Sequence, residues 1–142
     1  MTDTYNLQRF IDAQEAIYEE VLNQLKLGIK SGHWMWYIFP QVRGLGRSGT
    51  AQEFAISSLK EAEAYLKNSI LEERLRQCTQ LVFNIESRDI GQIFGYPDNL
   101  KFRSSMTLFL HATKDNKIFK NALLKYFQGE PDNLTLDILQ GF

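Results

Sequence analysis

Apolar residues recur every three or four positions along most of the chain, which is the spacing that places them on one face of an α-helix. The clearest stripes cover residues 17–25, 71–82, 102–110 and 118–126. Shorter apolar groups near residues 7–11, 54–55, 59–66 and 90–94 have the same character. The pattern predicts an all-α protein of about seven or eight helices of mixed length.

Helix start signals support this interpretation. Residues 12–15, 50–53, 58–61 and 69–72 each begin with Asp, Thr or Ser and end with Glu, the form of a capping box. Ser87 is a predicted cap for the helix near residue 90, Asp98 and Asp115 begin two later helices, and Gly129 ends the last of these. The remaining tail, from residue 132 on, is apolar enough that we expect it to pack back onto the core.

One segment departs from the helical pattern. Residues 34–39, WMWYIF, are six consecutive large apolar side chains between a histidine and a proline. They form the one credible strand of the sequence, but a lone strand has no partner for its backbone hydrogen bonds. The segment therefore does not change the all-α prediction, and Trp36 is expected to be mostly buried.

Composition adds limits to this picture. A chain of 142 residues, 44% of them hydrophobic, predicts one domain over residues 1–142 with a single core. The 16 basic and 17 acidic residues are spread along the whole length, which argues against a nucleic-acid partner. No apolar run is long enough to span a membrane, and the first residues do not resemble a signal peptide. We expect a cytoplasmic protein.

The segment after the apolar run contains the pattern G-x-G-x-x-G, formed by Gly44, Gly46 and Gly49. In a dinucleotide-binding fold, such glycines form a tight turn between a strand and a helix beside a pyrophosphate group. A second strand ending in an acidic residue should follow, but residues 58–75 have helical patterns instead. No lysine follows the glycines as a phosphate-binding P-loop requires.

Two interpretations of this loop remain open. Arg43 and Arg47, with Ser48, Thr50 and the start of the next helix, are suited to hold a phosphate or carboxylate group. Alternatively, the glycines turn a corner and the arginines pair with surface acids. The first interpretation predicts that residues 44–50 form an irregular turn, with Thr50 capping the helix and Arg43 or Arg47 facing a cleft.

The aromatic segment is equally open. Trp34 and Trp36 are suited to stack against a ring, with His33 as a proton donor or acceptor, but most such runs are simply core. Ser104 and Ser105, beside Lys101, are suited either to a ligand or to close helix packing. The two histidines and the single cysteine, Cys78, form no metal-binding pattern. The sequence indicates no metal and no cofactor.

Three stretches together resemble a known family: SGHWMWYIFPQVRGLGRS, YLKNSILEERL and IFGYPDNLKFRSSMTLF. They are similar, in the same order, to the bacterial family called domain of unknown function 1810, sometimes labelled calpastatin-like. The resemblance implies a compact multihelical domain and brings no established reaction. The calpastatin label fits poorly, because that inhibitor is disordered whereas this composition describes a packed globule.

A fainter likeness is to NADAR proteins, glycosidases that act on ADP-ribose-type metabolites. Asp98, Lys101 and Met106 resemble their D-x-x-K-x-x-x-M element, although Met106 falls one position late. Glu53 is the nearest candidate for the catalytic acid, but its position in a capping box explains it without catalysis.

Two functional hypotheses follow. In the first, a pocket binds a small anionic metabolite such as a nucleotide or an ADP-ribose-like molecule, and either binding or hydrolysis follows. The candidate ligand-binding residues are His33, Trp34, Trp36, Gln41, Arg43, Gly44, Gly46, Arg47, Ser48, Lys101, Ser104 and Ser105. In the second, the chain is a helical protein-interaction module whose partner the sequence does not identify, and an exposed apolar patch would mark its surface.

Overall fold

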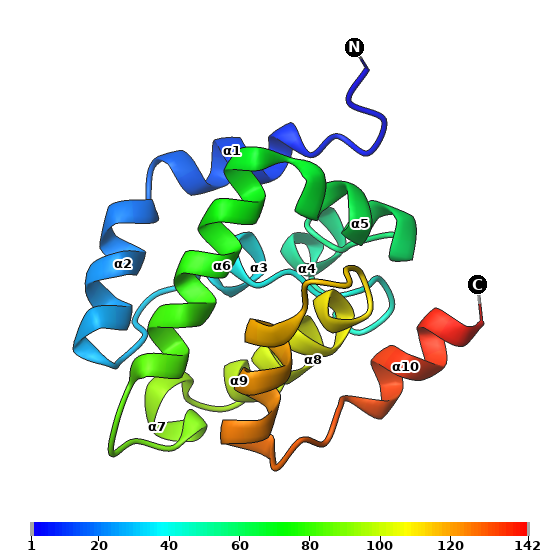
Figure 1. Ribbon diagram of the computed structural model, residues 1–142. Coiled ribbons are helices and arrows are strands. Elements are labelled where there is room, and N and C mark those ends of the chain that lie inside the picture. Colours follow the sequence, from blue (N-terminus) through cyan, green and yellow to red (C-terminus); the bar gives the residue numbers. More distant parts are fainter. Residues whose placement is uncertain (1, 142) are drawn as a thin grey trace.

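A computed structural model describes residues 2–141 and shows an all-helical protein (Figure 1). Within these residues there are ten helices rather than seven or eight, and no strand. The helices are α1 (Gln8–Glu15), α2 (Tyr18–Leu27), α3 (Met35–Ile38), α4 (Gly49–Glu53), α5 (Leu59–Lys67), α6 (Ser69–Asn84), α7 (Ile90–Phe94), α8 (Asp98–Leu110), α9 (Lys117–Phe127) and α10 (Asn133–Gln140).

The two helices missing from the prediction are α3 and α10. The apolar run at residues 34–39 is not a strand, because Met35–Ile38 forms a single helical turn, too short to show a helical period. Met35 and Ile38 are fully buried, whereas Trp36 packs against the core with part of its ring exposed. Trp36 is thus mostly buried, as expected, and its Nε1 atom lies fully inside the protein. The tail does pack back, as α10 against α8.

The helix starts lie close to the predicted caps but seldom on them. Ser58 caps α5 as expected, since its hydroxyl accepts a hydrogen bond from the Glu61 N–H. Asn68, not Ser69, caps α6, and Asp89, not Ser87, caps α7 with a closed capping box to Gln92. The residue directly before the first turn takes the role, because its side chain is the one that reaches the free N–H groups of that turn.

The first predicted box was wrong for a different reason. Asp12 lies inside α1, and α1 begins earlier, where the Asp3 carboxylate accepts hydrogen bonds from the Leu7 and Gln8 N–H groups. The chain before α1 is thus held against the helix rather than trailing from it.

The core is built around α8, the yellow-green helix near the centre of Figure 1. Its residues from Ser104 to Phe109 are all buried, which is typical of a helix covered on every side rather than of a surface helix. Helices α5, α7, α9 and α10 pack against it, and α6 packs against α2, α5 and α9. Phe102 is the centre of an aromatic group with Phe39 and Phe94, at centroid distances of 5.0 and 5.1 Å.

Two further findings concern the fold as a whole. No helix among residues 2–141 has both the length and the apolar character needed to cross a bilayer. The same residues contain no group of three His, Cys, Asp or Glu side chains placed to hold a metal ion.

Candidate functional site

A cleft of about 490 Å³ opens between α3, the loop before α4, α8 and the start of α10. Its volume is within the range of roughly 300–1,000 Å³ that small-molecule sites occupy. We call it the Trp36 cleft. It is lined by Trp36, Gln41, Leu45, Gly46, Arg47, Ser48, Ala51, Pro97, Leu100, Lys101, Ser104, Asp132 and Leu134.

Gln41 is held in this cleft by its backbone. The Gln41 carbonyl accepts a hydrogen bond of 2.8 Å from the Ile56 N–H, and the Arg43 N–H donates to the Ile56 carbonyl at 2.8 Å. This isolated bridge fixes the extended segment between α3 and α4. Gln41 is only 9% exposed, yet its side-chain amide forms no hydrogen bond with the described residues. The amide atoms are not among the fully buried unpaired atoms, so they face the cleft and are available to a ligand.

Lys101 is positioned by both an aromatic ring and a carboxylate. Its Nζ lies 4.0 Å from the centre of the Trp36 ring and 3.1 Å from Asp98 Oδ1. The other carboxylate oxygen, Oδ2, lies 2.8 Å from Lys30 Nζ, whose side chain is almost fully buried. Burial by itself would raise the pKa of Asp98, but hydrogen bonds from Lys30 and Lys101 outweigh it and lower the pKa. Asp98 is therefore ionised and shared by two cations.

The loop before α4 needs its glycines for packing. A Cβ atom at Gly46 would lie 2.5 Å from the Cβ of Ala51 and 3.9 Å from Trp36 Nε1, so no side chain fits there. The Trp36 Nε1 atom is buried and has no hydrogen-bond partner among the described residues. Gly44 has a φ of +106°, a conformation that residues with a side chain rarely adopt. The two glycines thus have a structural role in the loop, whereas the ion pairs with surface acids that the structural interpretation expected for Arg43 and Arg47 are not formed within residues 2–141.

Arg47 and Ser48 follow in the same loop. The Ser48 hydroxyl caps α4 by accepting a hydrogen bond from the Ala51 N–H, so Thr50 is not the cap that the sequence suggested. Arg47 is exposed, lines the cleft, and forms no ion pair with any described residue. Its guanidinium group is thus free to bind a ligand, whereas the Ser48 hydroxyl already has a structural role.

The opposite wall is formed by α8 and α10. Ser104 donates a hydrogen bond to Asp132 Oδ2 at 3.0 Å, and the Asp132 N–H donates to Thr107 Oγ1 at 2.9 Å. Asp132 is also the cap of α10, since its Oδ2 accepts hydrogen bonds from the N–H and hydroxyl groups of Thr135. These contacts attach α10 to α8 and fix the Asp132 carboxylate in the cleft.

Several predicted residues lie elsewhere. His33 and Trp34 line a separate hollow of about 200 Å³ beside α2. The buried Trp34 donates a hydrogen bond from Nε1 to Gln24 Oε1 at 2.9 Å, so its one polar atom already has a partner within the protein. Gly44 packs near Ile138 on α10. Ser105 is fully buried, and its hydroxyl has no partner among the described residues.

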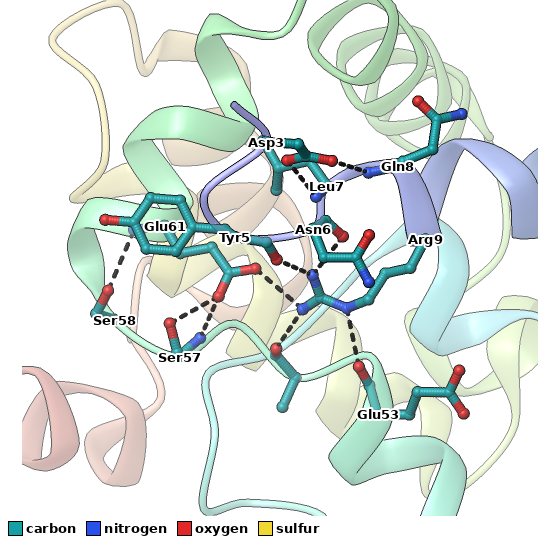
Figure 2. Close-up of polar contacts among 11 residues, drawn as sticks. Asp3, Tyr5, Asn6, Leu7, Gln8, Arg9, Glu53, Ser57, Ser58 and Glu61 are labelled. Carbon is teal, nitrogen blue, oxygen red and sulfur yellow. Dashed lines mark hydrogen bonds and ion pairs between the residues drawn. The ribbon is translucent and has the colours of Figure 1, made fainter. Parts of the chain in front are cut away.

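Arg43 lines a third hollow together with Arg9 and Glu61. Figure 2 shows the polar contacts of Arg9 and Glu61. The centre of that region is an ion pair of 2.9 Å between Arg9 and the buried Glu61. Arg9 also donates to the carbonyls of Tyr5, Asn6, Glu53 and Ala55. The exposed Glu53 is thus tied to Arg9 through its backbone and does not line the Trp36 cleft.

Sequence reasoning missed the contribution of α10 to the cleft. Asp132 and Leu134 lie about thirty positions after Lys101, and tertiary packing alone brings them together. The signal that points to Asp132 is the spacing Asp132-x-x-Thr135, a helix cap just before an apolar segment. Recognising the tail as a capped helix would have placed a carboxylate near α8.

Comparison with known proteins finds a family model and a solved structure that are similar to this chain. A family model described as Protein of unknown function (DUF1810) matches residues 4–139. The crystal structure of the conserved hypothetical protein Rv1873 from Mycobacterium tuberculosis is similar, with 48% identity, a TM-score of 0.96, and coverage of 97% of this chain and 99% of that chain. No curated protein matches. The likeness to NADAR proteins gains no support from these matches.

Proposed function

The chain belongs to the DUF1810 family, and we propose that its Trp36 cleft binds a small anionic metabolite. The observation that carries the proposal is the Gln41 side chain, which is nine-tenths buried and has an amide without a protein partner. The amide atoms are not among the fully buried unpaired atoms, so they reach the cleft, where a ligand can replace water as their partner.

The charges around the cleft favour an anion. Lys30 and Lys101 share the single carboxylate of Asp98, so this cluster has a surplus positive charge, with Lys101 at the cleft. Arg47 adds a second cation that has no acidic partner among the described residues. Asp132 is the one acidic side chain of the lining. The surplus positive charge of the lysine cluster and the charge of Arg47 together exceed the one negative charge of Asp132. A concave site with low-dielectric walls strengthens the resulting field.

The apolar part of the lining favours a metabolite with a hydrophobic portion rather than a bare inorganic ion. Trp36, Leu45, Pro97, Leu100 and Leu134 lie beside the polar groups. Mixed lining of this kind, mostly apolar with a few polar groups that fix orientation, is typical of small-molecule sites. The proposal is therefore the binding of such a metabolite.

The alternative of a protein-interaction module has less support. Large exposed apolar side chains include Leu27 and Ile29 at the end of α2, Ile70 on α6, Tyr96 before α8 and Leu124 on α9, which belong to different parts of the chain. Two others, Leu100 and Leu134, line the Trp36 cleft and are explained by it. Apolar surface residues scattered over separate segments do not mark an interface.

The test compares two arginines of one loop. Binding of inorganic phosphate, ribose 5-phosphate and adenosine 5′-monophosphate is measured by calorimetry for the parent, Arg47→Glu and Arg43→Glu. Both arginines are exposed, but Arg47 alone lines the cleft. We expect Arg47→Glu to abolish binding and Arg43→Glu to retain it, with little change in melting temperature for either. Equal affinity in all three proteins, or no binding by the parent, would refute the proposal.

A further inference from the structure

The most unusual polar group of the cleft is the Asp132 carboxylate, because its two oxygens have different surroundings. Oδ2 accepts hydrogen bonds from the Thr135 N–H at 3.2 Å and the Thr135 hydroxyl at 2.5 Å. It also lies 3.0 Å from the Ser104 hydroxyl, whose single proton is shared with the Leu100 carbonyl at 3.1 Å. Oδ1 accepts none from the described residues, and it is not among the fully buried unpaired atoms. One oxygen is fixed to the protein and the other is left open.

This arrangement holds Oδ1 rigidly. The carboxylate cannot turn without breaking the bonds to both α8 and α10, and the Asp132 N–H is itself held by Thr107 on α8. A structural cap for α10 requires one oxygen only. A rigid carboxylate oxygen with no protein donor, in the wall of a cleft, is suited to accept a hydrogen bond from a ligand.

The chemistry of that ligand follows from the charges. A carboxylate repels phosphate oxygens, so the anionic part of the ligand belongs near Arg47 and Lys101, which are cations. A group that bonds to Oδ1 must be a donor, and a hydroxyl group donates without adding a charge. Lys101 and Ser104 are three residues apart on α8 and so lie on the same face of the helix, with Asp132 bonded to Ser104.

We infer that Asp132 is the hydroxyl-recognising residue of the Trp36 cleft, and that the ligand is a phosphate ester that also carries a hydroxyl group. A sugar phosphate and a ribonucleotide share this chemistry. The inference rests on the proposed function and deepens it, because it names the class of anion and the residue that selects it. It gives Asp132 a role in specificity and assigns it no role in a reaction.

The experiment uses ligands that differ only in their hydroxyl groups. The parent is titrated with adenosine 5′-monophosphate and with its 2′,3′-dideoxy analogue by calorimetry. A hydrogen bond from a ligand hydroxyl to the charged Asp132 carboxylate should make adenosine 5′-monophosphate bind at least about tenfold more tightly than the dideoxy analogue. Ribose 5-phosphate is the third ligand: affinity equal to that of the nucleotide identifies the sugar phosphate as sufficient, and weaker affinity shows that the base contributes. Both results support the inference.

Two variants attribute the selectivity to Asp132. Asp132→Asn keeps an oxygen for the cap but removes the charge, and Asp132→Ser keeps the cap with a shorter side chain that lacks the second oxygen. In both variants, the affinity for adenosine 5′-monophosphate divided by that for its dideoxy analogue is expected to fall to about one. The control is Asp137→Asn, which removes an exposed carboxylate from the same helix and should keep the parent's ratio. A merely structural role would lower the melting temperature without changing the ratio.

The two proposals fail in different ways. If the parent binds the nucleotide and its dideoxy analogue equally, or if the folded Asp132 variants keep the parent's ratio, Asp132 does not select hydroxyl groups. The anion proposal would then still stand. If the parent binds no phosphate compound, both proposals are refuted. The comparison of two ligands on the parent remains decisive even if neither Asp132 variant folds.

Discussion

The Lys101 ammonium group lies over the face of the Trp36 ring, 4.0 Å from its centre. The contact joins α3 to α8 across the Trp36 cleft and places a cation against a partly exposed aromatic ring. Cation–π contacts of this geometry contribute roughly 0.5–2 kcal/mol, depending on how far the pair is desolvated. The same pair makes Trp36 a reporter of the electrostatic potential in the cleft.

Trp36 fluorescence is expected to be quenched by anions in preference to cations. The chain has two tryptophans, so Trp34→Phe leaves Trp36 as the only one. Because Lys101 lies over its ring, iodide should quench this variant more strongly than caesium does. In the matched variant Trp36→Phe, the remaining Trp34 is buried and should resist both ions. Stronger quenching by caesium in the Trp36-only protein would show that the cleft does not attract anions.

Gly46→Ala is expected to destabilise the protein, whereas Gly49→Ala is not. A Cβ atom at Gly46 would meet the Ala51 Cβ at 2.5 Å, while one at Gly49 meets nothing within 4 Å. Overpacking of this kind costs about 1–3 kcal/mol. At Gly49, in the first turn of α4, alanine is compatible with the helical backbone and removes the flexibility of glycine. Urea denaturation of the two variants checks this, and equal stability would contradict the assigned role of Gly46.

The stabilisation that Asp98 provides is expected to depend on pH in one direction. Its pKa in the folded protein lies below the usual 3.8, so its contribution to the free energy of unfolding is complete above pH 3.8. As the pH falls through the folded-state pKa, the contribution is lost. Asp98→Asn should therefore be less stable than the parent by about 1.5–3 kcal/mol near neutral pH, the range for hydrogen bonds to charged groups.

The measurement is urea denaturation of both proteins near neutral pH and at about pH 2.5, where the two curves should approach each other. Asp89→Asn is a suitable control, because Asp89 caps α7 and takes part in no ion pair with the described residues. A difference between parent and Asp98→Asn that stays constant at low pH would show that Asp98 acts through packing instead.

The sequence predicted the kind of fold well because helical periodicity is a local property. The stripe at Leu71, Leu75, Cys78 and Val82 lies on the buried face of α6, as its spacing requires. Where the prediction failed, that local period was missing. The six apolar residues 34–39 could not reveal a helix, because the single turn Met35–Ile38 is too short to show a helical period. The contact of Trp36 with Lys101 on α8 comes from far along the chain.

The candidate site was predictable only in part, again because some of the contacts that form it are not local in the sequence. Gln41, Arg47 and Lys101 were all named from the sequence and do line one cleft, whereas Arg43 lies only four residues from Arg47 and lines another hollow. The bridge from Val42 to Ile56 and the positive φ of Gly44 separate the two arginines. Loop geometry of that kind depends on packing rather than on the residue types of the loop itself.

The Arg9 guanidinium group joins the N-terminal segment to the turn between α4 and α5 (Figure 2). It donates to four carbonyl groups and to the Glu61 carboxylate, so all its N–H groups have partners. Glu61 is 2% exposed and also accepts hydrogen bonds from the Ser57 N–H and hydroxyl groups. Arg9→Met would leave a buried carboxylate without its cation, which costs about 3–5 kcal/mol.

Arg9→Lys separates the effect of charge from that of geometry. Lysine keeps the positive charge but has three donors on one atom, so it cannot reach the carbonyls on both sides as the planar guanidinium does. We expect Arg9→Lys to recover only part of the stability lost in Arg9→Met, as measured by urea denaturation. Arg43→Lys serves as the matched control, because Arg43 is exposed beside the same hollow and forms no ion pair with the described residues. If Arg9→Lys were as stable as the parent, charge alone would hold this segment in place, and the forked hydrogen bonds would contribute nothing measurable.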